Sequence, residues 1–180
     1  AALTGNSILS MYISDCWTLK QIDAGVLGSG TEWGDDAWSI STGHVYAGEQ
    51  AAVLWKGAVN SRSLLISPKL QILEPNAYEV SFNIYRQDGN TKDLEGVRLW
   101  VNTSKDTLGG TLLAYVPHYI KTSVPGGVPT EDEAGFYEYS AVIPMADNAL
   151  YVIFEGITQG GADLYIDNVI VRPLPSCRRP

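Results

Sequence analysis

The chain has 180 residues, of which 45% are hydrophobic and only 18% are charged, and its formal net charge is −8. These totals indicate a folded domain with a sizeable core and exclude an intrinsically disordered chain. The acidic balance argues against nucleic acid, which needs a basic surface, and against anionic membranes as partners. No window approaches 18 consecutive apolar residues, so the sequence predicts no transmembrane segment.

Strand-like runs follow one another along the chain, with turn residues between them. In order, they cover 7–14, 17–19, 37–40, 51–55, 63–66, 78–85, 97–101, 111–116, 136–143, 150–155 and 164–171. The clearest run is 78–85, in which large apolar residues alternate with polar ones, as expected for an antiparallel strand with one buried face. Ten or eleven strands with few helical periods predict an all-β fold, a two-sheet antiparallel β-sandwich.

The last run, 164–171, carries a carboxylate in its middle, Asp167. Strict alternation places apolar residues on both faces of this strand: Leu164, Ile166 and Ile170 on one, and Tyr165, Val169 and Val171 on the other. A carboxylate buried there must be neutralised, hydrogen-bonded or bound to a metal. Two hypotheses follow: Asp167 binds Ca²⁺ together with Glu49 or Asp15, or its oxygens accept N–H and hydroxyl hydrogen bonds near a turn.

A glycine-rich stretch, 23–36, ends in the adjacent acids Asp35 and Asp36. In a strand these side chains would point to opposite faces, but in a loop they could chelate Ca²⁺ together. A solvated turn is the alternative interpretation.

The chain has two cysteines, Cys16 and Cys177, one after the first run and the other after the last. A disulfide would form if the terminal strands are neighbours, and two independent thiols are the alternative.

Aromatic residues in loops are candidates for binding sugars, because aromatic rings stack on pyranose rings and loops at the ends of a sandwich often carry function. The candidates are Trp33 in the glycine-rich stretch, Tyr46, and Tyr119 in a long irregular segment, 118–134. Contact with a neighbouring domain is the alternative role for each of them.

Catalytic motifs are absent from the sequence. Its two histidines, His44 and His118, lie in no zinc-binding spacing, and the chain has no Gly-x-Ser-x-Gly motif. A glycosidase of this fold would carry paired carboxylates on its strands, and no alternating acidic triplet occurs. The sequence therefore predicts that the protein is not an enzyme.

The order of short motifs resembles one family of secreted modules. The motifs are Asp15-Cys16-Trp17-Thr18, Leu64-Leu65-Ile66-Ser67-Pro68, the strand at 79–86, Val97-Arg98-Leu99-Trp100, Gly135-Phe136-Tyr137, and Leu164-Tyr165-Ile166-Asp167-Asn168. This order, over about residues 7–172, is similar to that of the cleaved-adhesin or "choice-of-anchor J" family, which includes the adhesin modules of gingipains and is similar to MAM domains.

The resemblance implies a jelly roll, secretion or a place at the outer-membrane surface, adhesion or carbohydrate binding, and calcium sites that hold loops. In the gingipain modules, one calcium site resembles an Asp-x-Asp-Gly-Asp loop before a Trp. The corresponding stretch here has only Asp35 and Asp36 before Trp38, so it departs from that pattern.

We therefore expect a single jelly-roll domain, 1–172, followed by a proline-rich link, 173–180, to another module of a multidomain chain. The expected function is adhesion or ligand binding at the surface of a bacterium, with a host or matrix protein or a glycan as partner. The alternatives are a carbohydrate-binding module attached to an enzyme and a structural spacer.

Overall fold

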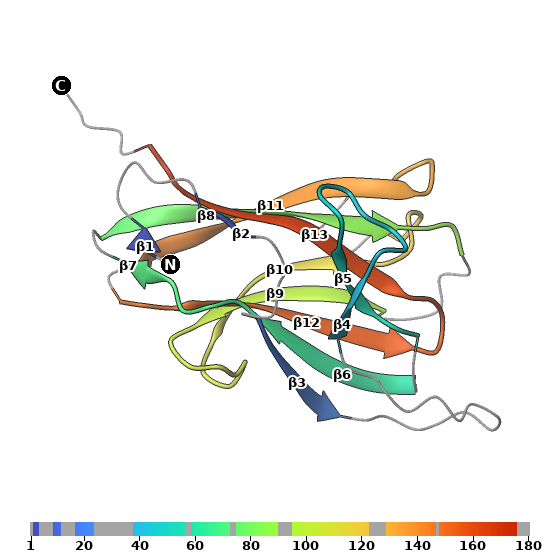
Figure 1. Ribbon diagram of the computed structural model, residues 1–180, viewed down its shortest axis with the longest axis horizontal. Coiled ribbons are helices and arrows are strands. Elements are labelled where there is room, and N and C mark those ends of the chain that lie inside the picture. Colours follow the sequence, from blue (N-terminus) through green and yellow to red (C-terminus); the bar gives the residue numbers. More distant parts are fainter. Residues whose placement is uncertain are drawn as a thin grey trace.

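The structure is a computed structural model that describes residues 2–3, 9–11, 17–23, 38–56, 59–72, 75–89, 95–122, 129–146 and 148–175. Within these ranges the regular secondary structure consists of β-strands (Figure 1). The described residues include no helix long and apolar enough to cross a membrane.

Most strands belong to two antiparallel sheets. The five-stranded sheet has the order β10 (Thr111–Pro117), β9 (Gly96–Asn102), β12 (Tyr151–Gln159), β6 (Val59–Ile66), β3 (Thr18–Asp23). The six-stranded sheet has the order β11 (Gly135–Ala146), β8 (Asn76–Arg86), β13 (Leu164–Pro173), β5 (Ala51–Leu54), β4 (Trp38–Ser41), with β2 (Leu9–Met11) also paired to β13. Two short strands, β1 (Ala2–Leu3) and β7 (Gln71–Ile72), form a separate parallel pair.

The chain crosses repeatedly between the two sheets, from β5 to β6, from β8 to β9, and at each step from β10 to β13. This crossing pattern places the sheets face to face, as in a jelly roll. The two-sheet antiparallel sandwich expected from the alternating runs is confirmed.

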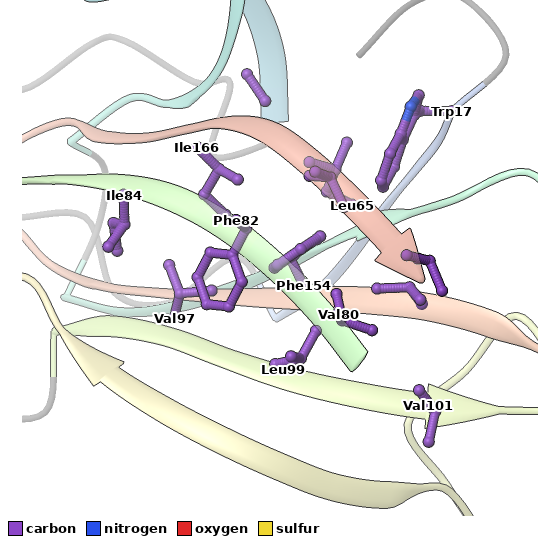
Figure 2. Packing of buried hydrophobic residues seen from close by; sticks show 14 of the residues in the cluster. Trp17, Leu65, Val80, Phe82, Ile84, Val97, Leu99, Val101, Phe154 and Ile166 are labelled. Carbon is purple, nitrogen blue, oxygen red and sulfur yellow. The ribbon is translucent and has the colours of Figure 1, made fainter. Parts of the chain in front are cut away.

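The hydrophobic core lies between the sheets and takes every second residue of the central strands (Figure 2). Phe82 of β8 and Phe154 of β12 meet edge to face across the core, with their ring centroids 5.1 Å apart. Full burial of each such side chain contributes about 1.5–3 kcal/mol. Position 156 accommodates only glycine, because an added Cβ would lie 2.4 Å from Leu54 and 2.8 Å from the Trp38 ring.

The facing predicted for β13 is wrong beyond Asp167. Asn168 has a φ of 52°, and the pairing register with β8 shifts between Asp167 and Ile170. This β-bulge inserts one residue, so Val169 joins Leu164 and Ile166 in the core while Ile170 turns to the outer face. Alternation in a sequence cannot show such an insertion, because a bulge changes the period at one position only.

Candidate ligand-binding surface

A row of aromatic residues crosses the outer face of the six-stranded sheet. Phe136 of β11 pairs in register with Tyr85 of β8, which pairs in turn with Tyr165 of β13. The Tyr85 ring lies edge to face with Phe136 at 5.3 Å and with Tyr165 at 6.3 Å between centroids. Cross-strand aromatic pairs of this kind each contribute about 0.5–1.5 kcal/mol beyond their buried area.

The loop between β4 and β5, residues 42–50, passes over β13 of this sheet (Figure 1). Two of its residues add rings to the row. The His44 ring stacks on Tyr85 at 4.2 Å and 20°, and its edge meets Tyr165 at 4.8 Å. The Tyr46 ring meets Phe136 at 5.7 Å in an edge-to-face arrangement. The loop therefore joins the sheet residues in one continuous aromatic cluster.

Asp167 holds this loop in place through the backbone. Its Oδ2 accepts the N–H groups of Tyr46 at 2.8 Å and Ala47 at 2.9 Å, while its Oδ1 accepts the N–H of Asn168 at 2.7 Å. The carboxylate is buried, with Asp167 only 3% exposed. These contacts match the hydrogen-bonded alternative for Asp167, since three N–H donors compensate the desolvation of the carboxylate.

The predicted calcium site involving Asp167 and Glu49 stays a prediction. Glu49 lies on the same loop, two residues after Ala47, and its side chain is exposed. In the part of the chain that the structure describes, no group of three or more His, Cys, Asp or Glu residues is placed to hold a metal ion.

Three aromatic side chains on this face are exposed, those of His44, Tyr46 and Trp55. Tyr46 is 51% exposed, and Trp55, which follows β5 and donates its Nε1–H to the Ser39 hydroxyl at 2.8 Å, is 42% exposed. Tyr85 and Phe136 are half-buried, while Tyr165 is buried. We call these residues the aromatic surface: His44, Tyr46, Trp55, Tyr85, Phe136 and Tyr165.

Acidic groups border the aromatic surface. The exposed Glu138 follows Phe136 by two residues and therefore points outward from the same face. Burial, then the negative charge of Asp163 and the neighbouring Tyr85, raises the pKa of Tyr165. A surface of aromatic rings with carboxylates at its border favours neutral ligands over anionic ones.

The third aromatic candidate, Tyr119, lies in the interior, 7% exposed. Its ring stacks on His118 at 4.9 Å, and it fills the space beside Gly161, where an added Cβ would lie 2.1 Å from its hydroxyl. Burial, followed by a hydrogen bond to Glu95, raises the pKa of Tyr119. The expected sugar-stacking face at this residue is thus covered by protein.

The remaining predicted site residues lie outside the described residues. They are Trp33, the possible calcium ligands Asp35 and Asp36, and the cysteines Cys16 and Cys177. Their roles stay predictions.

Most of the aromatic surface was not predicted from the sequence, although the sequence carries one signal for it. In the run 78–85 the inward positions end at Ile84, so Tyr85 falls on the outward series after Asn83. A large aromatic residue at an outward strand position is a candidate for binding, because it leaves apolar area on the surface. The pairing of Tyr85 with Phe136 and Tyr165 required the sheet order, which the sequence does not supply.

Comparison with solved structures confirms the predicted resemblance at the level of the fold. The K1 cleaved adhesin domain of Lys-gingipain from Porphyromonas gingivalis has a TM-score of 0.62 and 19% identity, over 94% of this chain and 99% of that one. The K2 cleaved adhesin domain of Lys-gingipain has a TM-score of 0.61 and 17% identity, over 92% and 97%.

A carbohydrate-binding module solved in complex with β-1,4-galactotriose is also similar, with a TM-score of 0.51 and 15% identity over 89% of this chain and 90% of that one. Neither the protein-family models nor the curated protein sequences include a match to the chain. The likeness is therefore one of fold, shared by adhesin domains and carbohydrate-binding modules.

Proposed function

We propose that the chain is a non-catalytic adhesion module that binds neutral glycans through the aromatic surface. The observation that carries this proposal is the row Phe136, Tyr85 and Tyr165 together with the loop that presents His44 and Tyr46. Aromatic side chains provide large, rigid contact area, and their π faces suit the C–H groups of sugar rings.

The aromatic surface is also held in position before a ligand arrives. Asp167 fixes the backbone at Tyr46 and Ala47, and the stacking of His44 on Tyr85 fixes the preceding part of the loop. A surface ordered in advance loses less conformational entropy on binding, which raises affinity for a given contact area. The exposed Tyr46 would provide the main stacking contact, with Trp55 extending the surface at its end.

The likeness in fold supports a binding role. Its structural neighbours include adhesin domains and a carbohydrate-binding module. We propose that the protein works at the bacterial surface or after secretion, as one module of a longer chain. A carbohydrate-binding module attached to an enzyme is the second candidate, since the same aromatic surface would serve it equally well, and neighbouring sequence would separate the two.

Binding of neutral oligosaccharides tests the proposal. On an array of neutral oligosaccharides that includes β-1,4-galactotriose, we expect binding by the unchanged protein and a loss of about 5-fold or more in affinity for Tyr46→Ala, because truncating an aromatic contact residue costs more than about 1 kcal/mol. Because Tyr46 is half exposed, the truncation should leave the fold intact, and circular dichroism checks that it does.

Leu112→Ala is the matched control. Leu112 is exposed to nearly the same extent, 47% against 51%, but it lies on β10 at the edge of the other sheet. The control should bind like the unchanged protein. If no neutral oligosaccharide binds, or if Leu112→Ala weakens binding as much as Tyr46→Ala, the proposal is wrong.

A further inference from the structure

A pocket of about 230 Å³ lies on the five-stranded sheet, away from the aromatic surface. Its lining residues are Asn60, Arg62, Arg98, Ile157 and Gln159, from β6, β9 and β12. The neighbours of Arg98 in β9, Val97 and Leu99, point into the core, so Arg98 points outward. The pocket therefore opens on the outer face of this sheet.

The fully buried carboxylate of Glu155 lies beside the pocket and pairs with its arginines. Glu155 of β12 is 0% exposed, and its Oε1 accepts the Nε–H of Arg62 at 2.6 Å and also pairs with Nη2 of that side chain. Its Oε2 accepts the indole N–H of Trp100 at 2.8 Å. Arg62 and Trp100 thus supply a hydrogen-bond donor to each oxygen of the Glu155 carboxylate.

Arg98 adds a second positive charge, in ion-pair range of the single negative charge of Glu155. Its Nη1 lies 3.7 Å from Oε2, which is beyond hydrogen-bond distance. A guanidinium group has five N–H donors, so Arg62 also keeps donors that Glu155 does not use. The arginine side chains are 39% and 32% exposed while the carboxylate is 0% exposed, so a ligand can reach the excess positive charge.

Amide groups complete the other end of the pocket. Gln159 donates its Nε2–H to Oδ1 of Asn60 at 2.9 Å. Asn60 has a φ of 64°, a left-handed conformation that is uncommon for a residue other than glycine, and the register of β12 against β6 shifts at Gln159. A bulge of this kind re-aims side chains, and local backbone strain is concentrated at binding sites. Ile157, 5% exposed, forms an apolar floor.

We propose that this pocket binds the carboxylate of an acidic sugar, a hexuronate residue of a glycan. The arginines match a carboxylate through bidentate N–H donation, and the amides offer both donors and acceptors for neighbouring hydroxyl groups. A volume of about 230 Å³ lies below the roughly 300–1,000 Å³ of pockets for drug-sized ligands, which fits one sugar residue. This site goes beyond the proposed function, and each can fail without the other because they occupy different sheets.

Titration with a galacturonate tetramer, followed by NMR of the uniformly ¹⁵N-labelled protein, tests this proposal. We expect shifts of the Arg62 and Arg98 Nε–H signals and of the Ile157 and Gln159 amides, with no shift of the Tyr46 amide. The methyl-esterified tetramer, which lacks the charge, should leave these signals in place. Sodium sulfate and a tetraglutamate peptide, tested separately, should shift them far less than the galacturonate tetramer.

Arg98→Gln should weaken binding of the galacturonate tetramer by about 10-fold or more, because it removes the charge-assisted hydrogen bonds from Arg98 to the ligand carboxylate. Arg172→Gln is the matched control, since Arg172 pairs with Glu79 on the opposite sheet and this variant should bind normally. Gln159→Leu provides a second test that removes no charge from the pocket and should also weaken binding.

The proposal is overturned if the galacturonate tetramer leaves the Arg98 signal unchanged, or if its methyl ester shifts the same signals. It is equally overturned if sulfate or tetraglutamate binds as well as the tetramer, which would indicate a general anion site or a peptide site.

Discussion

Two buried carboxylates, one on the outer face of each sheet, are satisfied in opposite ways. Asp167 on the six-stranded sheet accepts backbone N–H groups, two of them from the loop 42–50. Glu155 on the five-stranded sheet accepts side-chain donors from Arg62 and Trp100, with Arg98 nearby. Asp167 is 3% exposed and Glu155 is 0% exposed, so each needs partners to offset the cost of burial.

The choice of partners gives the two faces different properties. Backbone N–H groups carry no net charge, so Asp167 orders a loop without adding a cation to the aromatic surface. Guanidinium groups carry charge, so two arginines around one carboxylate leave positive charge that faces solvent. This local positive charge is an exception in a chain whose net charge is −8. This difference in charge is the physical basis of the two proposals, a neutral glycan on one face and a hexuronate on the other.

Arg62→Ala should give the largest loss of stability on either face. It removes the strongest partner of Glu155 and leaves a buried carboxylate with incomplete compensation, which costs about 3 kcal/mol. The measurement is urea denaturation. Glu155→Gln should cost clearly less, because Arg62 is partly exposed and can turn to water. Equal losses of stability for both variants would show that the uncompensated Glu155 carboxylate is not the main source of the free-energy cost.

His118 sharpens the comparison because it is a polar group that is buried without a charge of its own to compensate. Neither of its ring nitrogens has a hydrogen-bond partner among the described residues. Burial, and then the positive charge of the buried Arg86, lowers the pKa of His118 from 6.5 to about 4. The folded state therefore favours the neutral form of the His118 ring.

A folded-state pKa below the unfolded value means that protonation favours the unfolded chain. The contribution of His118 is fully present above pH 6.5 and is lost as the pH falls from 6.5 towards 4, by roughly 3 kcal/mol in all. Urea denaturation across this pH range measures the slope of the free energy of unfolding against pH. His118→Phe should flatten it, and a slope that the variant leaves unchanged would assign the effect to other groups.

Asp167→Asn should cost about 2 kcal/mol, since it replaces charge-assisted hydrogen bonds and turns an amide donor towards an N–H group. Hydrogen exchange at the Tyr46 and Ala47 amides should accelerate, while the Trp100 and Arg62 signals on the other sheet stay unchanged. Unchanged protection at these two amides would contradict the role of Asp167 in holding the loop.

Chelation of calcium should change the stability of the protein least of all. If hydrogen bonds alone hold the loop 42–50, EDTA and millimolar Ca²⁺ leave the melting temperature and the Tyr46 amide protection unchanged. A melting temperature that rises with Ca²⁺ would show a calcium site, because a ligand that binds only the folded chain must stabilise it. Asp167→Asn, tested in parallel, would then show whether that calcium lies at Asp167.

Most strands were predictable from local alternation, although β3 ends four residues after the predicted run 17–19 and β6 begins four residues before the predicted run 63–66. The runs at 78–85, 97–101 and 111–116 differ from β8, β9 and β10 by at most two residues at each end. The free-energy cost of burying Asp167 was likewise predictable from the apolar residues of the strand around it. Its partners were not, because the N–H groups of Tyr46 and Ala47 are supplied by a loop about 120 positions away in the chain.

The binding surfaces were less predictable, because they depend on which strands are neighbours. Tyr85, Phe136 and Tyr165 meet only through the order β11-β8-β13. Arg62, Arg98 and Glu155 meet only because β12 lies between β6 and β9. The bulge at Asn168 shows the same limit on a smaller scale, since one inserted residue exchanged the faces of Val169 and Ile170.

The most direct test of two independent faces is an NMR titration with both probes on one sample. With β-1,4-galactotriose added first to saturation, the galacturonate tetramer should bind with the same affinity as to the free protein. The first sugar should shift the Tyr46 and Tyr85 amides, and the second the Arg98 and Gln159 signals. Competition between the two probes, or shifts confined to one set of residues, would contradict the account.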